Sequence, residues 1–168
     1  MNNTITLHII RFIVLVLVQS LILNNINFLG YINPYIYILF ILLYPINNNR
    51  LLFIFLGFIL GLSVDLFLDS GGVHAAASVL IAYVRPLFLK FSFGMAYEHQ
   101  TVKISASDFP QRLSYFSLMT VLHHLILFSL EVFKTSEVLL ILKKTLFSSI
   151  FTILLCILIT ILFSRKTK

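Results

Sequence analysis

Hydrophobic residues occur along the chain in six long runs, which short polar segments separate. The runs show no regular alternation of apolar and polar positions, whereas the strands of a membrane β-barrel are segments of about ten residues that alternate. An open sheet could not satisfy its backbone in lipid, so each run predicts a helix. The runs cover residues 9–29, 33–46, 51–68, 73–91, 113–133 and 138–163.

The shortest run, residues 33–46, is bounded by Pro34 and Pro45. Asn33 as a helix cap and Pro34 at the first helical position are a typical helix start, and they favour a helix that spans the membrane. The length of the run also fits a re-entrant or interfacial segment. Three tyrosines lie at or just before the start of the run and a fourth lies near its end, and we expect them at the two membrane interfaces. They are Tyr31, Tyr35, Tyr37 and Tyr44.

Composition agrees with a membrane protein. The chain has 168 residues, of which 60% are hydrophobic and 11% charged, and its mean hydropathy is +1.03. A soluble domain of this size could not hide so much apolar surface from water. A span needs about 20 residues, so six or so spans leave no room for a soluble domain. We therefore expect an all-α membrane protein, in which residues 1–168 form one polytopic domain of about six transmembrane helices.

The formal net charge of +6 would suggest a nucleic-acid partner for a soluble protein. Here the basic residues lie mostly between apolar runs, so we expect membrane orientation to explain them and no nucleic acid to bind. With six spans, both termini and most basic residues share one side, which the positive-inside rule makes cytoplasmic. The hydrophilic loop of residues 92–112 lies on the same side. These basic residues are Arg11, Arg50, Lys90, Lys103, Arg112, Arg165, Lys166 and Lys168.

A polar stripe runs along the third predicted helix. Gly57, Gly61, Asp65 and Asp69 follow at intervals of four residues, and each step turns only about 40° around a helix. The glycine pair allows a neighbouring backbone to come close. A carboxylate at position 65 lies within the bilayer, so it should face protein or a wet cavity and have a partner.

The fourth predicted helix carries a matching face of small residues that ends in a cation. It consists of Ala75, Ser78, Ala82 and Arg85. The tight turn before this helix makes it antiparallel to the third helix, so we expect the two faces to pack together. Asp65 then looks toward His74, and Arg85 lies roughly 12 Å deeper, too far for a direct ion pair. We favour a polar clasp that fixes helix packing, or a partner site built on it, over a proton or solute path.

Other polar residues predict no chemistry. His123 and His124 point about 100° apart on a helix, so they cannot share one metal-binding face. Gln19 is expected to form a hydrogen bond between helices, and a single cysteine, Cys156, excludes an internal disulfide. No nucleophile motif, phosphate-binding loop or dinucleotide fingerprint occurs. We therefore expect neither enzymatic activity nor a cofactor or metal.

Four segments give the chain a family resemblance: "RFIVLVLVQSLILNNI", "GYINPYIYILFILLYPI", "LGFILGLSVDLF" and "GGVHAAASVLIAYVRP". On these segments the chain resembles the MreD family of bacterial rod shape-determining membrane proteins. The third segment holds the family's glycine, aspartate and phenylalanine, and the fourth its glycine, histidine, alanine and arginine. These residues are Gly61, Asp65, Phe67, Gly72, His74, Ala75 and Arg85. The carboxy-terminal half matches in hydropathy alone.

The resemblance implies a non-enzymatic scaffold of the cell-elongation complex in the bacterial cytoplasmic membrane, which supports peptidoglycan synthesis and cell shape. It implies direct binding of MreC, and a complex with MreB, RodA and a class B penicillin-binding protein, surrounded by membrane lipid. It also implies a fold similar to the substrate-binding subunits of energy-coupling-factor transporters. The alternative is a small-solute-binding membrane subunit of a transporter. A lipid-handling enzyme is a weaker alternative, because no nucleophile or metal cluster is present.

Overall fold

The computed structural model describes residues 2–26, 28, 32–46, 49–99, 102–133 and 135–163. The described residues form helices, and the only β-pairing among them is an isolated bridge between Phe28 and Ile32. The five long helices are α1 (Asn2–Leu21), α3 (Arg50–Leu68), α4 (Val73–Phe93), α6 (Phe109–Val132) and α7 (Val138–Phe163). The short elements are α2 (Ile38–Leu43), α5 (Met95–Glu98) and the 3-10 turns Leu23–Asn25, Ile104–Ala106 and Thr135–Glu137.

The prediction of an all-helical protein is confirmed, and its membrane character is supported at a coarse level. Five helices are long and apolar enough to cross a membrane. Their outward faces carry large hydrophobic side chains, for example Leu51, Leu66 and Leu87, which are 70% or more exposed. Such a surface suits lipid as its solvent. The chain is therefore consistent with a multi-pass membrane protein.

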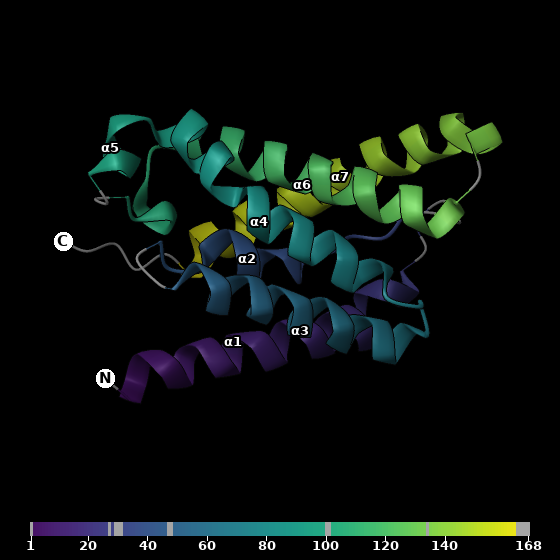
Figure 1. Cartoon of the computed structure of the whole chain (residues 1–168), viewed down its shortest axis with the longest axis horizontal. Helices are drawn as coiled ribbons and strands as arrows, with labels where there is room; N and C mark the ends of the chain where they lie inside the picture. The colour runs from purple at the N-terminus through teal and green to yellow at the C-terminus, as the bar shows by residue number, and fades with distance from the viewer. Residues whose placement is uncertain are drawn as a thin grey trace.

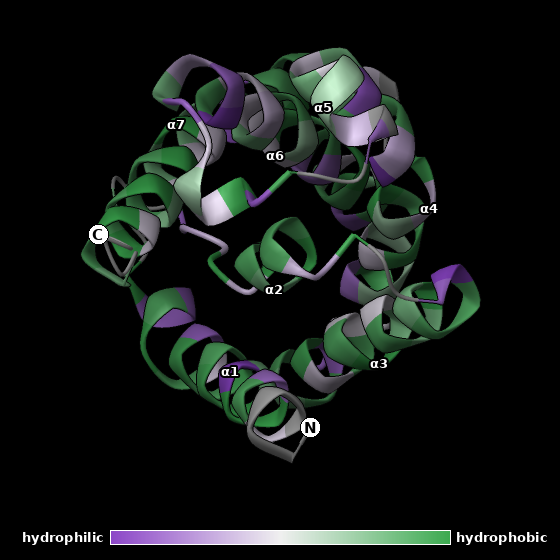
Figure 2. Cartoon of the chain, turned by 90° about the vertical axis from the view of Figure 1, so that its left-hand side faces the viewer, coloured by the Kyte–Doolittle hydropathy of each residue, from purple (hydrophilic) through white to green (hydrophobic). Residues whose placement is uncertain are grey.

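The long helices form a ring around the short helix α2, and Figure 2 shows α2 inside the circle of α1, α3, α4, α6 and α7. Successive long helices run in opposite directions from α3 onward, and α4 packs along both α3 and α6, while α6 packs along α7. In Figure 1, α1 begins and α7 ends on the left, where α3 also begins. The chain between α1 and α3 must therefore return through the ring, and α2 lies on that return path.

Residues 33–46 do not form the spanning helix that the sequence predicts. Residues 33–35 are not helical, and α2 comprises six residues that begin only after the cap residue Tyr37. Protein surrounds most of this segment, so its backbone finds side-chain partners and does not depend on a continuous helix for its hydrogen bonds. The residues Tyr37 to Leu42 are at most 3% exposed. We call residues 32–46 the central segment.

The prediction of two tyrosine belts is wrong for three of its four members. Tyr35 is 7% exposed, Tyr37 is completely buried and Tyr44 is 5% exposed. They point into the ring of helices because the segment that carries them lies inside the ring. Tyr31, the fourth member, lies outside the described residues.

Helix ends follow local hydrogen-bond chemistry. The side chain of Asn49 accepts from the backbone N–H groups of Leu51 and Leu52 and so caps α3. Helix α1 ends at Leu21, eight residues before the predicted limit, and the Asn25 side chain donates to the Leu21 carbonyl at 3.2 Å. Asparagine competes for backbone groups in this way, which ends the helix although apolar residues continue.

One end of the ring is rich in basic residues. Arg50 opens α3, Lys90 lies in the last turn of α4 and Arg112 lies in the first turn of α6. We call this the basic end. The predicted basic residues of the tail, Arg165, Lys166 and Lys168, lie outside the described residues. The α3–α4 turn, with Asp65 and Asp69, occupies the opposite end.

Candidate functional site in the polar interior

The glycines of α3 place its backbone directly against α4. A Cβ atom added to Gly61 would lie 2.4 Å from the carbonyl oxygen of His74, a distance that no real Cβ atom tolerates. A Cβ atom added to Gly57 would lie 3.3 Å from the Ala82 Cβ and 3.4 Å from the backbone carbonyl oxygen of Ser78. The two predicted faces of small residues therefore meet, and the contact is tightest at Gly61. Only a residue without a side chain allows this approach.

Asp65 caps the amino-terminal end of α4 from the neighbouring helix. One carboxylate oxygen accepts from the His74 backbone N–H at 3.0 Å and from the Ser70 hydroxyl at 2.6 Å. The other accepts from the Ala75 backbone N–H at 2.8 Å. The first N–H groups of a helix lack partners within it, and Gly72 at the cap position has no side chain to offer. The buried carboxylate of Asp65 supplies the hydrogen-bond acceptors that the cap residue of α4 lacks.

Arg85 holds the carboxyl end of α2. Its guanidinium donates to the Leu42 carbonyl at 3.3 Å and to the Tyr44 carbonyl, and its Nε donates to the Tyr115 hydroxyl at 2.8 Å. The Tyr115 hydroxyl in turn donates to the Leu42 carbonyl at 3.3 Å. The guanidinium also lies 4.9 Å from the centre of the Phe53 ring. A planar cation with several donors can satisfy all these partners at once.

Asp65 and Arg85 therefore act in different places. Each has its own set of partners in the described residues, and no ion pair joins the two. Asp65 holds the first turn of α4 at one end of the ring, and Arg85 holds the end of α2 nearer the other. The sequence predicted that the difference in depth would prevent a direct ion pair, but it did not predict that the backbone would provide the partners.

The extended start of the central segment is held in the same manner. The Gln19 side chain of α1 donates to the Pro34 carbonyl at 3.1 Å. The Tyr35 backbone N–H donates to the Thr152 hydroxyl of α7 at 2.9 Å. Together with Arg85 of α4 and Tyr115 of α6, four surrounding helices each send one polar side chain to the backbone of the central segment. Unpaired backbone groups in such an interior are costly, so these contacts stabilise its non-helical parts.

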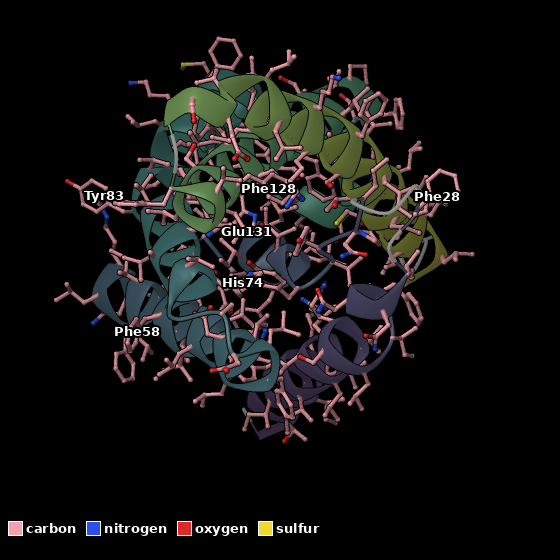
Figure 3. All side chains as sticks on the ribbon, turned by 90° about the vertical axis from the view of Figure 1, so that its right-hand side faces the viewer. Phe28, Phe58, His74, Tyr83, Phe128 and Glu131 are labelled. Carbon is pink, nitrogen blue, oxygen red and sulfur yellow. The ribbon has the colours of Figure 1, made fainter. Side chains whose placement is uncertain are left out.

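A tyrosine and two histidines meet at the centre of the ring. The Tyr37 hydroxyl lies 2.9 Å from Nδ1 of His74 and 2.7 Å from Nε2 of His123. A hydroxyl has one hydrogen, so it donates to one ring nitrogen and accepts from the other. Figure 3 shows His74 toward the inside of the ring, while Phe58 and Tyr83 lie on its outside. We call Tyr37, His74 and His123 the central triad of side chains.

His123 and His124 have separate partners. The Nδ1 atom of His124 lies 2.7 Å from the Thr120 carbonyl oxygen, and its Nε2 atom lies 3.3 Å from the Thr152 hydroxyl. Within the part of the chain that the structure describes, no group of three or more His, Cys, Asp or Glu side chains could hold a metal ion. The arrangement is a network of hydrogen bonds that joins α4, α6, α7 and the central segment.

Sequence reasoning missed several members of this interior. Tyr37 was expected at a membrane interface and not in the interior, and Tyr115 and Thr152 were not singled out. A signal for Thr152 does exist in the sequence: small and polar residues recur at intervals of four on the last helix, and all are buried. They are Ser148, Thr152, Cys156 and Thr160. For Tyr37 and Tyr115 the sequence offers no comparable pattern.

Some buried polar atoms have no hydrogen-bond partner among the described residues. On α6 near its centre and on α7 they include Thr120 Oγ1, His123 Nδ1, Thr145 Oγ1, Ser148 Oγ and Ser149 Oγ, and others lie on α1 and α4. Buried polar groups are satisfied in most proteins, by protein or by ordered water. Between α6 and α7, water or a small polar molecule would therefore find hydrogen-bond partners.

Comparisons of the chain with protein-family models, with curated proteins and with solved structures found no match.

Proposed function

We propose that the chain is a non-enzymatic membrane scaffold of the MreD type, which holds the membrane-spanning helix of MreC in the bacterial cell-elongation complex. In this proposal the chain lies in the cytoplasmic membrane with its basic end in the cytoplasm. The complex contains MreB, RodA and a class B penicillin-binding protein, and it supports peptidoglycan synthesis and cell shape. The support comes from the residues that carry the resemblance and from what they do in the fold.

The observation that carries the proposal is the use of both interior charges to hold backbone. The Asp65 carboxylate accepts three hydrogen bonds from the start of α4 and from Ser70. The Arg85 guanidinium donates to two carbonyls of the central segment. A catalytic acid or base must reach a substrate proton, whereas these groups are 4% and 3% exposed and face the protein's own main chain. They make the bundle rigid, which suits a scaffold.

The outer surface supports the same proposal. Helices associate in lipid through close packing of apolar and small side chains, and the ring exposes such side chains over its long helices. A rigid ring can favour one conformation of a bound helix only through a difference in affinity. The α3–α4 unit, with its glycine contact and its Asp65 cap, is the most tightly joined pair and is the part that we expect to keep this surface in shape.

Affinity capture from native membranes tests the proposal. The tagged full-length chain is extracted in mild detergent, and the proteins that co-purify are identified by mass spectrometry. A single-span protein of the MreC type should be recovered with the wild type and with Asp69→Asn, and less of it with Asp65→Asn. Asp69 is a matched control because it is exposed and lies one helical turn from Asp65. Capture of no single-span protein by the wild type would overturn the scaffold, and equal recovery with Asp65→Asn would overturn the role of Asp65.

A small-solute-binding subunit of a transporter is the second candidate. Polar atoms of Thr120, His123, Ser148 and Ser149 favour it, because they have no hydrogen-bond partner among the described residues and a polar solute would need such groups. Mass spectrometry of small molecules released from the purified protein separates the two functions. A solute present in equal amount to the protein, and lost in His123→Phe, would replace the scaffold proposal. Protein that releases no such solute would exclude this second candidate.

A further inference from the structure

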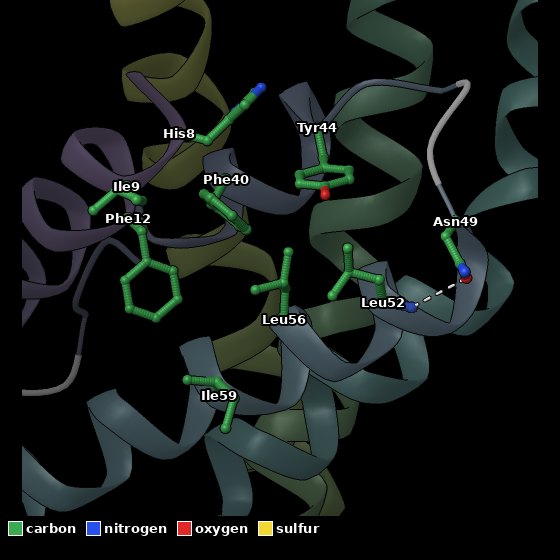
Figure 4. Close-up of a pocket in the computed structure, with 9 residues that line it drawn as sticks. All are labelled: His8, Ile9, Phe12, Phe40, Tyr44, Asn49, Leu52, Leu56 and Ile59. Carbon is green, nitrogen blue, oxygen red and sulfur yellow. Dashed lines mark hydrogen bonds between the residues drawn. The ribbon is translucent and has the colours of Figure 1, made fainter. Parts of the chain in front are cut away.

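An apolar groove opens between α1, the central segment and α3 (Figure 4). It has a volume of about 580 Å³. Ile9 and Phe12 line it from α1, Phe40 lines it from α2, and three α3 residues complete it. These three are Leu52, Leu56 and Ile59. Three polar side chains also line it: His8 and Asn49 at its mouth near the basic end, and Tyr44, which follows α2.

The depth of the groove matches one leaflet of a bilayer. It extends along α3 from Asn49 to Ile59, and the nine residues after Arg50 rise about 14 Å. Half of the hydrocarbon thickness is about 15 Å. A groove of one leaflet's depth with mostly apolar walls suits an acyl chain.

The charge around the mouth is positive. The first 64 residues of the chain contain no aspartate or glutamate, and every residue that lines the groove belongs to this part. Arg11 follows His8 by one turn of α1, and a long basic side chain on a helix tilts toward the helix start and reaches the membrane surface. The amino-terminal ends of α1 and α3, which carry partial positive charge, also lie at this end. The mouth thus complements a negatively charged headgroup.

We infer that this groove holds one acyl chain of an anionic phospholipid from the leaflet at the basic end, with the phosphate beside Arg11. The apolar walls take the chain, and the basic mouth selects the headgroup. This site is independent of the scaffold function, because it uses neither the α3–α4 contact nor the polar interior. Lipid bound here would fill the space between α1 and α3 and fix their separation.

Tryptophan fluorescence tests the inference, because the chain contains no tryptophan of its own. Phe12→Trp places one reporter in the groove, and Leu154→Trp places a control on the lipid-facing side of α7, where Leu154 is 55% exposed. The full-length protein is reconstituted in vesicles of equal phosphatidylglycerol and phosphatidylethanolamine, with bromine on the acyl chains of one lipid at a time. Brominated phosphatidylglycerol should quench the groove reporter several-fold more effectively. The control should respond equally to both lipids.

A third variant tests the role of the charge. Arg11→Gln in the Phe12→Trp background should lower the preference for phosphatidylglycerol about fivefold, as expected for one basic residue near a membrane surface. Ile9→Trp provides a second groove reporter should Phe12→Trp fold poorly. Equal quenching of the groove reporters by both lipids would overturn the inference, as would a preference that Arg11→Gln leaves unchanged. A groove reporter that neither lipid quenches would show that no lipid chain enters.

Discussion

The guanidinium group of Arg85 on α4 donates a hydrogen bond to the main-chain carbonyl of Tyr44, the residue that follows α2. The contact spans 41 positions of sequence and joins the central segment to the ring around it. The last carbonyls of a helix have no partner within the helix. The carbonyls at the end of α2 are buried inside the ring, so a buried cation takes the place that solvent would have in a soluble protein. Arg85 therefore has a structural role, which is to donate hydrogen bonds to the carbonyls at the end of α2.

Arg85→Met should destabilise the protein by about 3 kcal/mol, because it leaves the carbonyls of Leu42 and Tyr44 without a strong donor. Arg50→Met is the matched control. Arg50 is exposed and donates a hydrogen bond to the Tyr83 carbonyl, so its loss should cost less than about 1 kcal/mol. Unfolding of the purified protein in detergent, followed by circular dichroism, measures both. Similar losses for the two variants would contradict the role given to Arg85.

Gly61→Ala should destabilise the α3–α4 pair by about 1–3 kcal/mol, as overpacking typically does. The added Cβ would lie 2.4 Å from the His74 carbonyl oxygen and 2.5 Å from the Ala75 Cα, so the helices must separate. Gly57→Ala is milder, because its nearest neighbour would be the Ala82 Cβ at 3.3 Å. In thermal unfolding, the midpoint temperature of Gly61→Ala should be well below that of Gly57→Ala. The reverse order would show that the helices do not approach most closely at Gly61.

Asp65→Asn should lower stability by roughly 2 kcal/mol, because an amide cannot replace both carboxylate oxygens as acceptors for His74 and Ala75. Asp69→Asn should change stability little. Asp69 adopts a left-handed conformation with φ of 50°, which asparagine also tolerates. The same unfolding assay compares the two variants. An Asp69→Asn loss as large as that of Asp65→Asn would contradict the capping role.

Tyr37→Phe should cost about 1–3 kcal/mol, because it removes the hydroxyl between His74 and His123 and leaves two buried ring nitrogens without that partner. Tyr83→Phe removes a hydroxyl from a side chain that is 60% exposed, and it should be close to neutral. The difference between the two unfolding free energies measures the central triad. A neutral Tyr37→Phe would mean that these contacts add no stability.

Hydropathy was sufficient to predict the five long helices, although the predicted range for α1, 9–29, lies too far along the chain. Helix α3 begins one residue before the predicted range of 51–68, and α7 covers the predicted range of 138–163. The interval of four between Gly57 and Gly61 likewise predicted a close approach of α3 to α4, since helix periodicity fixes which side chains share a face. These features are local, so a single sequence contains them.

The central segment could not be predicted in the same way. An apolar run with a favourable helix start reads as a spanning helix when lipid is assumed to surround it. The observed structure depends on Gln19, Thr152, Arg85 and Tyr115 arriving from four other helices to bond its backbone. Such partners are distant in sequence. They also bind main-chain atoms, which every residue has, so the sequence does not show which residue each side chain will bind. For the same reason the sequence showed Asp65 and Arg85 as buried charges without showing what they bind.

Hydrogen–deuterium exchange of the central segment tests the main claim most directly, namely that Arg85 holds this segment inside the ring. The backbone N–H groups of Leu39 and Phe40 already bond to Ile36 and Tyr37, so they should exchange slowly in the wild type and in Arg50→Met. In Arg85→Met, peptides that cover residues 36–45 should exchange much faster, while peptides from α7 keep their protection. Equal protection of residues 36–45 in Arg85→Met and wild type would contradict the claim.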